Sequence, residues 1–154
     1  MKSSRFSTSF GLFMLRLFVG GLFAAHGYPK VFGGGETQLP DQVARYLGTD
    51  FVQAMQGGPA GFAEALRSMG IPMPAVSARF VGILELAGGL FLIVGLLTRP
   101  IALLLAINMA VGIRKAHWPQ GLMAAGGMEY PLLLLGACLA LTFAGPGKIS
   151  VWNK

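Results

Sequence analysis

Four long apolar runs dominate the chain and restrict it to a small set of folds. They cover residues 10–27, 76–97, 100–116 and 126–144. Each run is close to the ~20 residues that an α-helix needs to cross the hydrocarbon core of a bilayer. Only helices and closed barrels satisfy their backbone groups in lipid, and these runs are too continuous for barrel strands. The sequence therefore predicts a polytopic membrane protein with four transmembrane helices.

The connections between the runs predict how these helices are arranged. The second, third and fourth runs are joined by short segments, which favour antiparallel neighbours in an up-down bundle. The longer first connection contains residues 59–69, which begin with Pro59, precede Gly70 and place Phe62, Leu66 and Met69 on one face. We expect a short amphipathic helix there, lying on the bilayer surface in the first extracytoplasmic loop, and a second short helix within residues 40–48. The predicted fold is thus an all-α, four-helix antiparallel bundle that forms one membrane domain over residues 1–154.

The composition excludes several classes of protein. Apolar residues make up 54% of the chain and charged residues 12%, which is incompatible with a water-soluble monomer and makes the lipid bilayer the expected environment. The single cysteine, Cys138, excludes a disulfide framework, a Cys-x-x-Cys pair and a cysteine-held iron–sulfur cluster within the chain. The net charge of +6 is spread along the sequence without a basic block, so nucleic acid is not an expected partner.

Three polar residues fall deep inside the expected spans. Arg16, Glu85 and Asn108 lie at a similar depth if each run is an ideal helix. Because an isolated ion there costs about 3 kcal/mol on insertion scales, we expect Arg16 to pair with Glu85 and Asn108 to complete the hydrogen bonds. Two interpretations remain open. The group is either a structural clamp between helices or the floor of a ligand cavity.

A second polar layer is expected nearer the first loop, with contributions from all four helices. Its members are His26, Lys30, Arg79, Arg114, Lys115, His117, Glu129 and Tyr130. Positive charge is in excess in this layer, so it would attract an anion or an oxygen-rich head group. The alternative is that these side chains only reach the lipid phosphates, as interfacial Lys and Arg usually do.

The sequence offers little for other kinds of chemistry. His26 and His117 would ligate a haem only if the first and third spans faced each other, and no Cys-x-x-Cys-His motif accompanies them. We therefore expect neither haem, nor a metal site, nor a covalently bound cofactor. Nucleophile-elbow motifs, phosphate-binding glycine loops and dinucleotide fingerprints are absent as well.

Seven short motifs in a fixed order give the chain a resemblance to a known family. They are Leu15-Arg16-Leu17, His26-Gly27-x-x-Lys30-Val31-Phe32-Gly33, Gly70-Ile71-Pro72-x-Pro74, Gly82-x-x-Glu85-x-x-Gly88-Gly89, Gly95-Leu96-x-Thr98-Arg99, Gly126-Gly127-x-Glu129-Tyr130-Pro131 and Gly145-Pro146-Gly147. Together they resemble the DoxX family of small bacterial four-helix inner-membrane proteins. The resemblance implies a relationship to the membrane subunit of thiosulfate:quinone oxidoreductase, a link to redox complexes at the membrane, and both termini in the cytoplasm. Counting basic residues alone leaves the orientation undecided, because they are divided equally between the two sides.

The leading hypothesis is a membrane redox subunit that binds a quinone or a small anionic reductant in the outer half of the bundle. His26 and Glu129 would exchange protons in catalysis, and Arg79 would polarise a carbonyl or oxyanion. Further ligand contacts would come from Lys30, Arg114, His117 and Tyr130, above a floor of Arg16, Glu85 and Asn108. Electrons would come from a redox or periplasmic protein partner, because the chain has no redox centre of its own.

Two alternatives remain. One is a non-catalytic accessory subunit of a membrane complex, whose polar layer sets helix register and which needs no ligand. The other is a carrier for a small anion, which would form a homodimer in order to alternate access.

Overall fold

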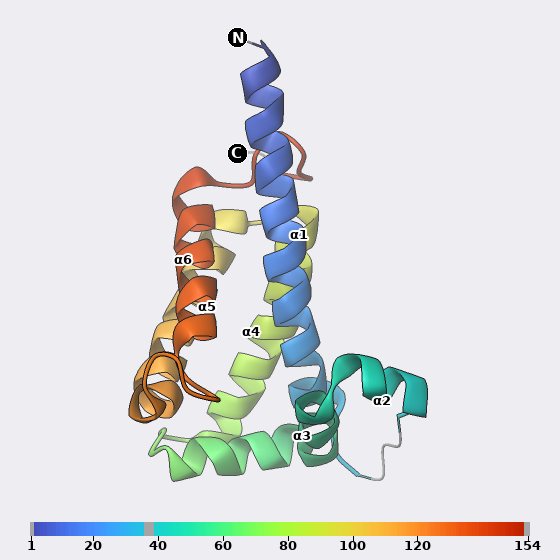
Figure 1. Cartoon of the computed structure of the whole chain (residues 1–154), viewed down its shortest axis with the longest axis vertical. Helices are drawn as coiled ribbons and strands as arrows, with labels where there is room; N and C mark the ends of the chain where they lie inside the picture. The colour runs from blue at the N-terminus through green and yellow to red at the C-terminus, as the bar shows by residue number, and fades with distance from the viewer. Residues whose placement is uncertain (1, 36–38, 153–154) are drawn as a thin grey trace. The chain divides into compact units, whose positions relative to one another are not determined.

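The computed structural model describes residues 2–35 and 39–152, with the backbone alone for residues 2–5, and every regular element among them is helical. Figure 1 shows the elements in chain order. They are α1 (Lys2–Phe32), α2 (Asp41–Leu47), α3 (Thr49–Ser68), α4 (Pro74–Val94), α5 (Thr98–Gly112), the π-helix η1 (Ile113–His117), the 3-10 helix η2 (Trp118–Gln120) and α6 (Glu129–Ala144). The all-α prediction is confirmed for these residues.

Among the described residues, three helices are long and apolar enough to cross a membrane. They are Phe6–Phe32, Pro74–Val94 and Thr98–Gln120. The first corrects the expected boundary, since α1 continues five residues past Gly27. The fourth expected span is present as the apolar helix α6, but it has only 16 residues. Three membrane-spanning helices are therefore supported by length and composition, and a crossing by α6 stays a prediction.

Large apolar side chains on the surfaces of these helices support a lipid environment. Phe18 is 68% exposed, Ile83 58%, Leu133 73% and Phe143 77%. Exposed apolar surface of this kind is unfavourable in water and suits the hydrocarbon core of a bilayer. The protein is a membrane protein with several apolar helices.

The chain divides into two compact units. Unit 1 comprises Met1–Leu22 and Gly88–Lys154, and unit 2 comprises Phe23–Ala87. Helices α1 and α4 each contribute one segment to either unit. The expectation of a single membrane domain stays a prediction, and each unit is described by itself.

In unit 1, α5 and α6 lie side by side (Figure 1). The buried residues of α5 include Ala102, Leu105 and Ala106, and α6 buries Leu134 and Cys138. Leu105 and Ala106 lie three and four residues after Ala102, and Cys138 lies four residues after Leu134, so each set lies on one face of its helix. Small residues such as alanine allow two helix backbones to approach closely, which is how helices associate in lipid.

Arg16 joins the N-terminal segment of α1 to two other parts of unit 1. Its side chain is fully buried, and Nη1 donates hydrogen bonds to the carbonyl oxygens of Leu92 (3.2 Å) and Ile93 (3.4 Å). The Nη2 atom donates to the carbonyl oxygen of Ile149, in the segment that follows α6. Because α4 ends at Val94, the carbonyls of Leu92 and Ile93 belong to its last turn and carry the negative end of the helix dipole. The Leu92 carbonyl also accepts a hydrogen bond from the Gly95 N–H (3.1 Å). Backbone oxygens thus contact both Nη atoms of this buried cation, while its Nε atom has no hydrogen-bond partner among the described residues.

These contacts correct the expected ion pair between Arg16 and Glu85. The structure gives Glu85 a different cationic partner, Lys30. The prediction was wrong because α1 ends at Phe32, so Arg16 lies 16 residues, or about 24 Å, from that end. Glu85 is only 11 residues, or about 17 Å, from the start of α4. Asn108 lies half-buried on α5, and its expected role at this site stays a prediction.

Unit 2 contains a sharp bend in the first connection. Helix α3 includes Gly58, whose backbone is non-helical (φ 54°, ψ −155°). A Cβ atom at Gly58 would overlap the backbone of Gly33, and the Gly34 N–H donates a 2.6 Å hydrogen bond to the Met55 carbonyl oxygen. The bend therefore lets α3 fold against the residues that follow α1. Helical structure is confirmed both at α2 and beyond Pro59, while the position of either helix on a bilayer surface stays a prediction.

The close contact between Gly95 and Arg16 gives a test of the unit 1 structure. Gly95 has φ +77°, and a Cβ atom there would overlap Nη1 of Arg16. We expect Gly95→Ala to lower the free energy of unfolding by roughly 1–3 kcal/mol, because alanine is strained at this φ and displaces the guanidinium. The measurement is unfolding of the purified protein in mixed micelles titrated with dodecyl sulfate.

The control is Gly136→Ala on α6, where a Cβ atom meets open space. We expect this variant to stay within about 0.5 kcal/mol of the parent protein. Equal unfolding midpoints for the two variants would contradict the described role of Arg16.

Candidate functional site

The residues predicted for the site are distributed over both units. Unit 2 contains His26, Lys30, Arg79 and Glu85, and unit 1 contains Arg16, Asn108, Arg114, His117, Glu129 and Tyr130. Convergence of the whole set on one cavity therefore stays a prediction. Contacts that the structure does establish lie within each unit.

The central feature of unit 2 is an ion pair between Lys30 and Glu85. The Nζ atom of Lys30 donates a hydrogen bond to Oε2 of Glu85. The Glu85 side chain is only 3% exposed and that of Lys30 is 19% exposed. Both residues lie in helices apolar enough to span a membrane, where an unpaired charge is strongly unfavourable. Each residue thus provides the counter-ion that the other needs.

Close helix packing places this pair. A Cβ atom at Gly27 would overlap the backbone nitrogen of Leu86, so α1 and α4 approach closely beside Glu85. At Gly82, a Cβ atom would come within 3.1 Å of the Lys30 Cβ atom. Two glycines, one on each helix, therefore set the distance between the segments that carry the ion pair.

A third helix covers Lys30. Its Nζ atom lies 4.5 Å from the centre of the Phe62 ring, a cation–π contact from α3. Sequence patterning placed Phe62 on the apolar face of a surface helix and gave no sign of this contact. It arises from the bend at Gly58, which depends on the tertiary structure rather than on local spacing.

His26 completes the group, which we call the His26–Lys30–Glu85 cluster. His26 lies one helical turn before Lys30, so both side chains leave the same face of α1. The charges of Lys30, Glu85 and Asp50 all act on its imidazole ring. In contrast to Glu85, His26 is exposed at the surface of the protein. The cluster therefore combines a buried ion pair with an accessible imidazole that can donate or accept a hydrogen bond.

Arg79 lies in the same unit but in a different setting. It is on α4, six residues before Glu85, and its side chain is exposed. Asp50, at the start of α3, is the additional charged residue that acts on His26 and was not among the predicted site residues. In the sequence, Asp50 was recognisable only as an acidic residue in the long connection between the first and second apolar runs.

The predicted residues of unit 1 lie around the segment between α5 and α6. The π-helix η1 carries Arg114 and His117, and the His117 Nδ1 atom lies 2.7 Å from the Gly126 carbonyl oxygen. Because a carbonyl oxygen can only accept, Nδ1 carries the proton and donates this hydrogen bond. The contact connects η1 to the residues before α6. Glu129 begins α6, and both it and Tyr130 are exposed.

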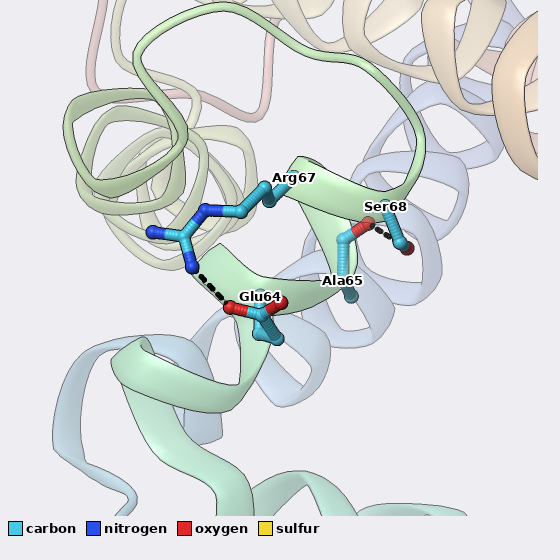
Figure 2. A network of polar contacts seen from close by, with 4 residues as sticks. All are labelled: Glu64, Ala65, Arg67 and Ser68. Carbon is cyan, nitrogen blue, oxygen red and sulfur yellow. Dashed lines mark hydrogen bonds and ion pairs between the residues drawn. The ribbon is translucent and has the colours of Figure 1, made fainter.

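An exposed ion pair on α3 provides a useful contrast. Figure 2 shows Arg67 directed toward Glu64, three residues earlier, beside the hydrogen bond from Ser68 Oγ to the Ala65 carbonyl oxygen. The two charged side chains are 65% and 67% exposed. Such pairs contribute little to stability because water screens them. This pair therefore indicates a solvated helix face rather than a site.

The geometry limits the chemistry that the cluster can perform. In the part of the chain that the structure describes, no group of three or more His, Cys, Asp or Glu side chains could hold a metal ion. What the cluster offers is hydrogen bonding to a polar group and proton exchange through His26.

Comparison with known proteins identifies one family. The family model described as DoxX matches residues 11–118, more than two-thirds of the chain. The matched range includes Arg16, its partners Leu92 and Ile93, and the whole His26–Lys30–Glu85 cluster, but not Ile149. No curated protein matches significantly, and neither does any solved structure.

The ion pair makes a prediction about stability. We expect Lys30→Met and Glu85→Gln each to lower the free energy of unfolding by about 3 kcal/mol, because each leaves its partner without a counter-ion. The double variant should recover part of this loss. The measurement is a double-mutant cycle in mixed micelles, with an expected coupling energy above about 1 kcal/mol.

The matched control is the cycle of Arg67→Met and Glu64→Gln on the exposed pair. We expect its coupling energy to lie between about 0 and 1 kcal/mol. A coupling for Lys30 and Glu85 no larger than that of this surface pair would contradict the described role of the buried ion pair.

Proposed function

Because this chain belongs to the DoxX family, we propose that it is the membrane subunit of a quinone-linked redox system. The quinone head group would bind at the His26–Lys30–Glu85 cluster. The observation that carries the proposal is the placement of a buried ion pair beside an accessible histidine in apolar helices. Ionisable groups inside membrane helices are costly, and they commonly mark ligand or proton pathways.

The proposed chemistry uses the groups that the cluster provides. A quinone presents carbonyl oxygens, which accept hydrogen bonds from the imidazole of His26 or the ammonium of Lys30. Reduction of a quinone to a quinol takes up two electrons and two protons. In this proposal His26 exchanges protons with the bound head group, while the electrons come from a partner protein that carries a redox centre.

Arg79 has a defined role in the same proposal, in which it would polarise a quinone carbonyl from α4. The roles expected for Glu129, Arg114, His117 and Tyr130 concern residues of unit 1 and stay predictions from the sequence. A small anionic reductant is the other ligand that this set of cations would suit.

A second candidate function is favoured by the same ion pair. Glu85 already neutralises Lys30, so the cluster is satisfied without any ligand. That observation supports a non-catalytic accessory subunit, in which the cluster fixes the register of α1 and α4. Co-purification with a stoichiometric protein partner, without a retained small molecule, would favour this candidate over the quinone proposal.

One hydrogen bond supports a four-crossing topology. The Lys148 N–H, which follows α6, donates to Ser9 Oγ near the start of α1 at 3.3 Å. Ser9 and Lys148 therefore lie at the same end of unit 1. An even number of crossings between them satisfies this constraint, and α6 would be the fourth. We propose the bacterial inner membrane as the location, with Ser9 and Lys148 on the cytoplasmic side.

Quinone binding by the purified protein tests the proposal. We expect a ubiquinone or menaquinone analogue to bind saturably in detergent, and His26→Ala to raise its dissociation constant roughly tenfold through loss of a hydrogen bond. Mass spectrometry of small molecules retained after gentle solubilisation identifies the native ligand.

The control is Gln56→Ala, an exposed position on α3 outside the cluster. It should leave the dissociation constant unchanged. Saturable binding that is equally strong in the parent protein and in His26→Ala would refute the site, and absence of saturable binding would refute the quinone proposal.

A further inference from the structure

The turn between α4 and α5 contains a motif that the proposed function does not use. It is Gly95-Leu96-Leu97-Thr98-Arg99 in unit 1. Gly95 (φ 77°) and Leu97 (φ 49°) both have left-handed backbone conformations, and Leu97 is a non-glycine residue for which this is strained. Leu97, the strained residue, directly precedes the first turn of α5.

The first turn of α5 is left without a cap. Its N-cap residue is Leu97, whose side chain makes no capping hydrogen bond, and the turn contains no acidic residue. The N–H groups of Thr98 and Arg99 point out of the helix start, where no helical carbonyl is available to them. The positive end of the helix dipole lies at the same place. These features suit an anion, as they do at many helix N-termini.

Arg99 adds a full positive charge to this end of the helix. A cation in the first turn is repelled by the dipole and lowers helix stability when nothing compensates it. Among the described residues, the structure shows no carboxylate paired with Arg99. Its guanidinium instead lies against Gly145, where a Cβ atom would come within 3.0 Å of Nε. Arg99 therefore increases the positive charge beside α5 rather than balancing it.

Thr98, the first residue of α5, both lines a cavity and carries an unsatisfied hydroxyl. The cavity has a volume of about 130 Å³ and is lined by Leu97, Thr98, Arg99, Pro100, Pro146 and Trp152. Thr98 is 2% exposed, and its hydroxyl has no hydrogen-bond partner among the residues that the structure describes. A buried hydroxyl without a partner is unfavourable and indicates a missing one.

We propose that this cavity is a binding site for a phosphate group. Arg99, the hydroxyl of Thr98 and the first N–H groups of α5 would contact its oxygens. The remaining walls are apolar, with Trp152 from the segment after α6 on one side. That segment is held in place by hydrogen bonds from the Val151 N–H to the Val94 carbonyl (3.0 Å) and from the Trp152 N–H to the Gly95 carbonyl (3.3 Å).

Two sources could supply the phosphate group. Because the cavity lies where two apolar helices end, it is at the expected depth of phospholipid head groups. The apolar walls beside Trp152 suit the glycerol region of such a lipid, since tryptophan is enriched at membrane interfaces. Free inorganic phosphate presents the same oxygens without an apolar part. The site stands apart from the quinone proposal, which rests on unit 2.

Fluorescence of Trp152 tests the proposal directly. In the full-length Trp118→Phe variant, Trp152 is the only tryptophan and lies in the cavity wall. The purified protein, in a detergent without phosphate, is titrated with phosphatidylglycerol, with sodium phosphate and with diacylglycerol. We expect a saturable change in emission with at least one of the two phosphate compounds and none with diacylglycerol. A response to phosphatidylglycerol alone identifies a lipid site, and a response to sodium phosphate identifies a site for the free anion.

Variants in the same background separate a binding role from a structural one. We expect Arg99→Gln to weaken binding roughly tenfold and Thr98→Val, which conserves shape, roughly threefold. Arg99→Lys retains the charge and should bind more tightly than Arg99→Gln. The control is Arg45→Gln, which removes an exposed arginine from α2 in the other unit and should not change the affinity.

The stability of each variant is followed by thermal unfolding, so that lost binding is assigned only to folded protein. If Arg99→Gln does not fold, Arg99→Lys and Thr98→Val still provide the comparison. Absence of a saturable response to both phosphate compounds would overturn the proposal. So would an equal response to diacylglycerol, or equal weakening by Arg45→Gln and the cavity variants.

Discussion

Placing a partner beside each buried charge is the constraint on which the rest of this structure depends. Two cations are held within apolar helices, and the chain satisfies them in different ways. Lys30 has a carboxylate partner in Glu85. Arg16 has backbone carbonyls at the end of α4 and beyond α6. Each solution requires close helix packing, because a buried charge without a partner is strongly unfavourable.

Three of the four expected spans were predictable from sequence because lipid imposes a simple rule on length and composition. The partners of the buried charges were not predictable, because they depend on where the first helix ends. The first apolar run ends at Gly27, and Pro29 usually marks the end of a helix. In the structure α1 continues to Phe32, and α4 approaches it closely at Gly27. Lys30 thereby enters the helix and becomes the partner of Glu85. The error in one helix end was enough to assign Glu85 to the wrong cation.

The residues of the candidate site were also predicted only in part. His26, Lys30 and Glu85 were identified from sequence as polar residues within or beside apolar helices. Phe62 and Asp50 were not identified. Their interactions with the cluster depend on how α3, which is bent at Gly58, folds against α1. The bend depends on contact between Gly58 and Gly33, a tertiary interaction with no periodic signal. Sequence patterns therefore identify which groups carry charge, and the tertiary structure determines which groups share a site.

The turn between α4 and α5 brings opposite ends of two helix dipoles together. The negative end of α4 is balanced by Arg16, a cation supplied by the chain itself. The positive end of α5 has no equivalent anion, and Arg99 makes the imbalance larger. If the only role of this motif were to turn the chain, an acidic residue or a capping side chain after Leu97 would serve better. The combination of Thr98 and Arg99 is instead what recognition of an external anion requires, so the asymmetry between the two helix ends is itself an argument for a ligand.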